Sequence, residues 1–157
     1  MQAEKAARME LEFPPDWRVL RDLRTFVNKL VVSVVDSDDL AARVSMVVTE
    51  LAENAVKYSR DSHQVVRLRV EPTENGIRCE TENTASAEHI SSLEATMAEV
   101  NEGDPLDAYA RALVAVSEND TSSRIGLARI RHEGQMTLRS AVTGSRVRII
   151  AEMPRAA

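Results

Sequence analysis

The chain has 157 residues, of which 43% are hydrophobic and 29% are charged, which is the size and composition of one globular domain over residues 1–157. Its formal net charge of -5 argues against nonspecific nucleic-acid binding, which relies on neutralising phosphates. No apolar stretch of about twenty residues predicts a membrane span. With a single cysteine, Cys79, and no signal-peptide core, we expect a cytoplasmic protein.

The first third of the chain predicts one short strand and two long helices. Asp16 stands at a suitable helix start, and Asp36 or Ser37 is placed to cap the second helix. The predicted elements are a disordered tail over 1–9, a strand over 10–13, and helices over 15–35 and 38–59.

After residue 59 the apolar period changes from that of a helix to that of a strand. Two alternating runs around a turn predict one hairpin, three helical patterns follow, and two further alternating runs predict a second hairpin. The expected strands are 64–71, 77–82, 136–142 and 146–153, with a helix ending near Gly103, one opening at Asp104 and one over 124–133. The inner face of the helix opening at Asp104 is expected to carry Leu106, Tyr109, Leu113 and Val116.

Strands that cluster in pairs between helices predict an α+β fold with two layers. We expect one mostly antiparallel sheet with the helices on one of its faces. The Arg and Glu residues that alternate on the first hairpin are expected to form a solvated sheet surface.

The motif with most chemical content is Glu-Leu-Ala-Glu-Asn-Ala-Val-Lys-Tyr-Ser at residues 50–59, within the second long helix. Glu50, Asn54 and Lys57 have i, i+4, i+7 spacing, so a carboxylate, an amide and an ammonium lie on one stripe of the helix. This stripe flanks the apolar stripe, which consists of Leu40, Val44, Val47, Leu51, Ala55 and Tyr58. The alternative is a solvated polar face without a site.

The string resembles the N-box of the GHKL ATPase superfamily, which includes histidine kinase catalytic domains and anti-sigma factor serine kinases. The resemblance implies a Bergerat fold with ATP and Mg²⁺ as cofactors. It also implies that Glu50 is catalytic and polarises a water or hydroxyl, that Asn54 ligates Mg²⁺, and that Lys57 approaches phosphate.

Both glycine boxes of this family are altered in this chain. Asn83 stands where the family has the aspartate that accepts the adenine amino group, and alanines replace the glycines at 85 and 87. In the second box Gly126 matches, whereas Arg124 replaces a glycine. Arg124 either contacts a phosphate or pairs with Glu50 across a collapsed site, and we favour the second. If the substitutions act independently, about 3 kcal/mol is lost, which corresponds to more than a hundredfold in affinity.

Three functions are therefore open. The first is a regulator of partner-switching signalling that binds a protein partner, a sigma factor or a small antagonist protein, with nucleotide binding weakened or lost. The second is an Mg-ATP-dependent serine/threonine kinase of the anti-sigma factor type that phosphorylates a small antagonist protein. The third is an unrelated α+β domain with a chance motif. Related anti-sigma domains dimerise, so by analogy we expect a homodimer.

Overall fold

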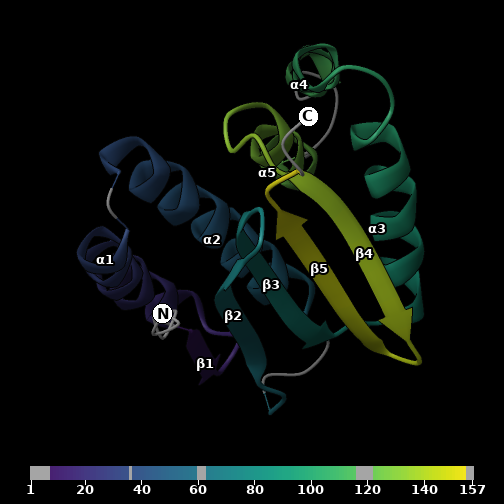
Figure 1. Cartoon of the computed structure of the whole chain (residues 1–157). Helices are drawn as coiled ribbons and strands as arrows, with labels where there is room; N and C mark the ends of the chain where they lie inside the picture. Colours follow the sequence, from purple (N-terminus) through teal and green to yellow (C-terminus); the bar gives the residue numbers. More distant parts are fainter. Residues whose placement is uncertain (1–7, 36, 60–62, 116–121, 155–157) are drawn as a thin grey trace.

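The computed structural model describes residues 8–35, 37–59, 63–115 and 122–154, and it contains five strands and five helices (Figure 1). In chain order they are β1 (Met9–Phe13), α1 (Trp17–Val34), α2 (Asp38–Tyr58), β2 (Val66–Thr73), β3 (Gly76–Thr84), α3 (Ala87–Val100), α4 (Pro105–Ala115), α5 (Ser122–His132), β4 (Thr137–Thr143) and β5 (Arg146–Glu152).

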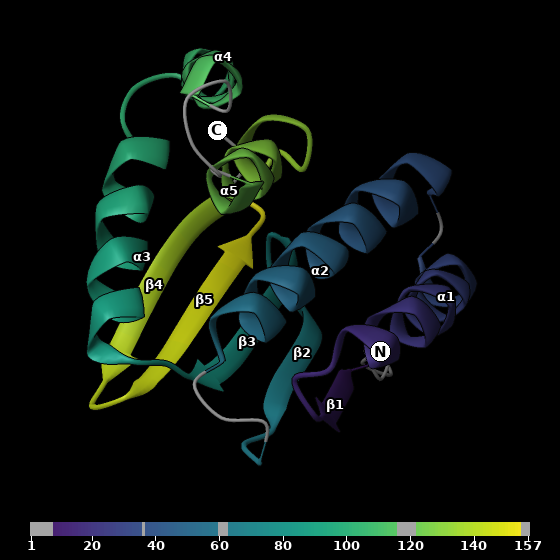
Figure 2. The same cartoon turned by 180° about the vertical axis from the view of Figure 1, so that it is seen from behind.

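The strands form one sheet in the order β1-β2-β3-β5-β4, and every neighbouring pair is antiparallel. The two predicted hairpins are β2–β3 and β4–β5, and the β3–β5 pairing, in which Thr81 lies opposite Ile149, joins them. Figures 1 and 2 show α1, α2 and α3 on the same side of the sheet. The expected α+β architecture, with two layers and helices on one face, is confirmed.

The core is organised around α2, whose apolar stripe lies against the sheet. Val44, Val47, Leu51 and Ala55 are all 0% exposed, as the helical period predicts. The helix begins where a capping residue satisfies its free amides, because the Ser37 side chain accepts a hydrogen bond from the Leu40 amide at 3.2 Å. Position 36, the other candidate cap, lies outside the described residues.

The face of the sheet away from the helices is covered by ion pairs between neighbouring strands. Glu80 on β3 lies at the centre of these ion pairs. The Glu80 carboxylate is 2.9 Å from Arg148 on β5 and 3.4 Å from Arg69 on β2. Cys79, the neighbour of Glu80, points into the core, and burial raises the pKa of its thiol to about 12. The thiol therefore stays protonated and unreactive in the folded chain.

Two elements differ from their predictions. The tail expected over 1–9 is too long, since Met9 is already in β1 and Arg8 pairs with Glu10 at 3.0 Å. In α4 the buried residues are Ala108 and Ala112, whereas Leu106 is 55% and Leu113 is 49% exposed. The expected inner face of this helix is therefore wrong for both leucines, and position 116 lies outside the described residues.

Among the described helices, none has the length and apolar character required to cross a membrane.

Because a leucine of α2 is buried and a leucine of α4 is exposed, replacing each by alanine should lower the free energy of unfolding by different amounts. We expect Leu51→Ala to lower the free energy of unfolding by about 2–5 kcal/mol, because it leaves a cavity in the core. Leu113→Ala, at an exposed site, is expected to change it by less than about 0.5 kcal/mol. Urea denaturation measures both, and equal losses would contradict the orientation of α4.

Candidate functional site

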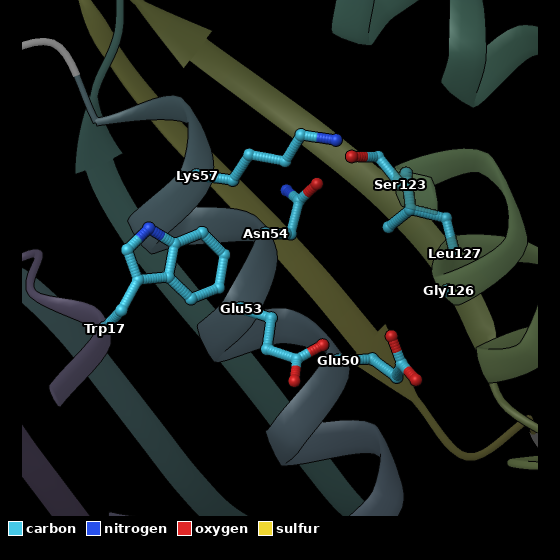
Figure 3. Close-up of a pocket in the computed structure, with 8 residues that line it drawn as sticks. All are labelled: Trp17, Glu50, Glu53, Asn54, Lys57, Ser123, Gly126 and Leu127. Carbon is cyan, nitrogen blue, oxygen red and sulfur yellow. The ribbon is translucent and has the colours of Figure 1, made fainter. Parts of the chain in front are cut away.

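The residues of the N-box-like motif line a small pocket between α2 and α5. The pocket has a volume of about 70 Å³. Figure 3 shows Lys57 and Asn54 extending from α2 toward Ser123, and Glu50 extending toward Gly126. The predicted stripe therefore faces a pocket, not bulk solvent. Its lining residues are Trp17, Glu50, Glu53, Asn54, Lys57, Ser123, Gly126 and Leu127.

Asn54 is the most buried polar residue of this pocket. It is 6% exposed, and its side-chain oxygen Oδ1 is buried without a hydrogen-bond partner. An unsatisfied buried carbonyl oxygen is unfavourable by roughly 1–3 kcal/mol, and a cation or a hydrogen-bond donor in the pocket would satisfy it.

Glu50 is held by contacts with α5. Its Oε1 accepts a hydrogen bond from Nη1 of Arg129 at 3.3 Å. A Cβ atom at Gly126 would lie 2.3 Å from Oε2 of Glu50, so only glycine at this position leaves room for the carboxylate. Glu50 thus fills the space beside the glycine, where the family resemblance implies phosphate.

Arg129 is also paired with Glu133, the residue that follows the end of α5. The carboxylate of Glu133, to which Arg129 donates a 2.6 Å hydrogen bond, raises the pKa of the Arg129 guanidinium above its usual value, and Glu50 adds to this shift. Arg129 therefore remains charged at every physiological pH.

From the sequence we expected Arg124 to pair with Glu50, and the structure shows that it does not. Its Nε lies 3.0 Å from the Glu99 carboxylate on α3. Arg124 lies in the first turn of α5, which begins at Ser122, on the side of the helix that faces α3. Arg129, three residues after Gly126 on the same helix face, takes the expected position beside Glu50.

Asn83 is not among the residues that line the pocket. It is 5% exposed near the end of β3, and its Nδ2 donates a long hydrogen bond of 3.5 Å to the Thr84 carbonyl. The segment that follows opens α3, with Ser86 as its cap. Gln135 is the one described non-glycine residue with positive φ, so Ala85 and Ala87, which stand where the family has glycines, are free of the backbone strain that positive φ would cause.

The C-terminal end of α2 is tied to two other helices through Tyr58. Its hydroxyl lies 2.6 Å from that of Ser123 on α5, and its ring meets the ring of His89 on α3 edge-on at 5.4 Å. These contacts close the end of the pocket near Lys57. Ser123 lies inside α5 and serves here as a bridge between helices.

The pocket as it stands does not fit a nucleotide. Pockets for molecules of that size have volumes of about 300–1,000 Å³, far more than the roughly 70 Å³ present here. The oxygens of Asn54 and Glu50 are of the type that Mg²⁺ prefers. However, Glu50 is already paired with Arg129, and the described residues contain no group of three His, Cys, Asp or Glu suited to a metal.

Sequence analysis missed three residues of this region. Trp17 lines the pocket from the first turn of α1, and Glu53 lines it while paired with Arg24 of α1. Their involvement depends on how α1 packs on α2, which periodicity does not give. The position of Arg129 could have been predicted, because its i+3 spacing from Gly126 places both residues on one face of the helix.

No protein-family model matches the sequence, and a comparison with curated proteins finds no match. Among solved structures, the chain is similar in fold to one in the SiaB-SiaC complex from Pseudomonas aeruginosa. The TM-score is 0.72 with 14% sequence identity, over 91% of this chain and 87% of the other. At this identity, the similarity shows the fold alone.

The contact between Glu50 and Gly126 predicts a coupled effect on stability. Alanine is favoured over glycine within a helix by about 1 kcal/mol, so Gly126→Ala should stabilise a Glu50→Ala variant by about that amount. In the wild type the gain should be smaller, because the new methyl group displaces the Glu50 carboxylate. A double-mutant cycle by urea denaturation measures the difference. Equal gains in both backgrounds would show that Glu50 does not rest on Gly126.

Proposed function

We propose that this chain is a regulatory protein of partner-switching signalling that acts mainly by binding a partner protein, with nucleotide binding weakened or lost. The observation that carries the proposal is the occupation of the pocket by its own side chains. Glu50 lies against Gly126 and pairs with Arg129, in the space where a related ATPase would need phosphate.

The pocket between α2 and α5 is kept closed more by apolar packing of α5 than by the ion pair between Arg129 and Glu50. The side chains of Arg129 and Glu50 are 41% and 19% exposed, so their pairing contributes about 0–1 kcal/mol. On α5, however, Leu127 is 1% and Ile130 is 0% exposed, and burial of each such side chain stabilises by about 1.5–3 kcal/mol. Moving α5 away from α2 would disturb this packing, so nucleotide entry is unfavourable.

The adenine end of the inferred site is also weakened. Asn83 offers a neutral carbonyl in place of a carboxylate, which reduces the strength of a hydrogen bond to an amino group by about 1 kcal/mol. The separation of Asn83 from the pocket lining adds to this loss. Because strain at positions 85 and 87 no longer contributes, we attribute the weakening mainly to the closed pocket.

The protein-binding part of the proposal has support from the fold. A chain of similar fold occurs in a complex of two proteins, SiaB and SiaC. The large apolar side chains that α1 and α4 leave exposed are suited to protein contacts, because exposed apolar surface is typical of interaction sites.

The second candidate is an Mg-ATP-dependent serine/threonine kinase, and the unsatisfied Oδ1 of Asn54 favours it. In that case Asn54 would hold Mg²⁺, Lys57 would lie near phosphate and Glu50 would orient the acceptor hydroxyl. ATP would supply the transferred phosphoryl group. This requires a state in which α5 has moved and Arg129 has released Glu50.

Titration calorimetry with Mg-ATP separates the two candidates. We expect no saturable binding at micromolar concentrations for the wild type, for Asn54→Ala, or for the control Asn75→Ala in the exposed β2–β3 turn. Micromolar binding by the wild type that Asn54→Ala abolishes and Asn75→Ala retains would reject the closed site and establish the kinase alternative.

A further inference from the structure

Helix α4 presents large apolar side chains to solvent and small ones to the body of the protein. Leu106, Ala110 and Leu113 follow i, i+4, i+7 spacing and are exposed, whereas Ala108 and Ala112 face inward. The usual distribution would place the leucines inside. We call the exposed side the α4 stripe, consisting of Leu106, Ala110 and Leu113.

The surface around the α4 stripe is acidic. Residues 99–110, from the end of α3 into α4, contain four carboxylates and no lysine or arginine. Within this group Glu99 alone pairs with a described cation, Arg124 of α5. Arg111, farther along α4, donates to the backbone carbonyls of Glu99 and Glu102, so its charge lies against the end of α3. The four carboxylates, all exposed, are Glu99, Glu102, Asp104 and Asp107.

A groove of about 530 Å³ adjoins the α4 stripe at Leu106. Arg131, which also borders it, donates hydrogen bonds of 2.6 Å and 3.1 Å to the carbonyls of Val100 and Gly103. The guanidinium thus lies against the C-terminal end of α3 and satisfies carbonyls that the helix leaves free. The apolar side chains that line the groove are Pro105, Leu106, Met136 and Pro154.

The position of α4 leaves this surface accessible. Figures 1 and 2 both show α4 beyond the end of the strands, beside α5. A cavity of about 300 Å³ lies on the opposite, inner face of α4, where Ala108 and Ala112 help to line it. The α4 stripe itself, beside the apolar groove, is a surface on which an amphipathic partner helix can pack.

We propose that the α4 stripe and the adjoining groove bind a basic amphipathic helix of a partner protein. Large apolar side chains of that helix would pack on Leu106 and Leu113, and its lysines and arginines would face the carboxylates of α3 and α4. The inference rests on the proposed function, since it names the chemistry of the protein partner.

A second copy of the chain is the main competing occupant. Helix α1 has the same chemistry as the proposed partner helix, because Phe26 is 51% and Val32 is 54% exposed beside Arg21 and Lys29. In that case α1 of one molecule would pack on α4 of a second molecule.

The test uses a labelled synthetic helix built from leucine and lysine, with fluorescence anisotropy as the readout. We expect micromolar binding that weakens at high salt and is absent for the same peptide with glutamate in place of lysine. The double variant Leu106→Ser with Leu113→Ser should weaken binding at least about tenfold, through lost apolar burial. The matched control, Phe26→Ser with Val32→Ser on α1, should stay within about twofold.

Circular dichroism confirms that both double variants remain folded, as their exposure implies. Equal affinities of the wild type and the α4 variant, or no binding by the wild type, would overturn the inference. Self-association in sedimentation equilibrium that Phe26→Ser removes would overturn it as well, since a second copy would then cover α4. The Mg-ATP titration is independent of these outcomes, so the proposed function can fail or stand separately.

Discussion

The close contact between α2 and α5 is the constraint on which the site depends. α2 is fixed by its buried stripe against the sheet, and α5 is fixed by Leu127 and Ile130. Gly126 lets the two helices approach until the Glu50 carboxylate touches the backbone of α5. The same glycine that would receive phosphate in a nucleotide site therefore accommodates a side chain of this protein, and the pocket that remains is small.

The architecture could be predicted from the sequence because each element has an unambiguous period and a capping or turn residue. The burial of Val44, Val47 and Leu51 follows from helical spacing, and Ser37 marks where α2 begins. The polar stripe of Glu50 and Asn54 was also readable, since residues four apart in a helix share a face. Its chemical role stays a prediction until ligand binding is measured.

The features of the structure that could not be predicted from the sequence depend on tertiary contacts. In α4 both faces are apolar, so periodicity alone does not choose between the alanines and the leucines, and the structure buries Ala108 and Ala112. Arg124 and Arg129 are both long enough to reach Glu50. The choice between them depends on which side of α5 packs against α2: Arg129 lies on that side, whereas Arg124 faces α3 and pairs with Glu99. The distance of Asn83 from the pocket likewise depends on how the strands and α3 are joined.

Helix α5 links the closed pocket to the acidic surface, since Gly126 and Arg129 face α2 while Arg124 and Arg131 contact α3 and its C-terminal end. The account assigns protein binding to one side of α5 and a filled nucleotide site to the other. The most direct measurement is a crystal structure grown with Mg²⁺ and a non-hydrolysable ATP analogue. The account predicts that Arg129 still pairs with Glu50 and that no nucleotide lies between α2 and α5. A bound analogue, with Mg²⁺ on Asn54 and Glu50 separated from Arg129, would contradict it.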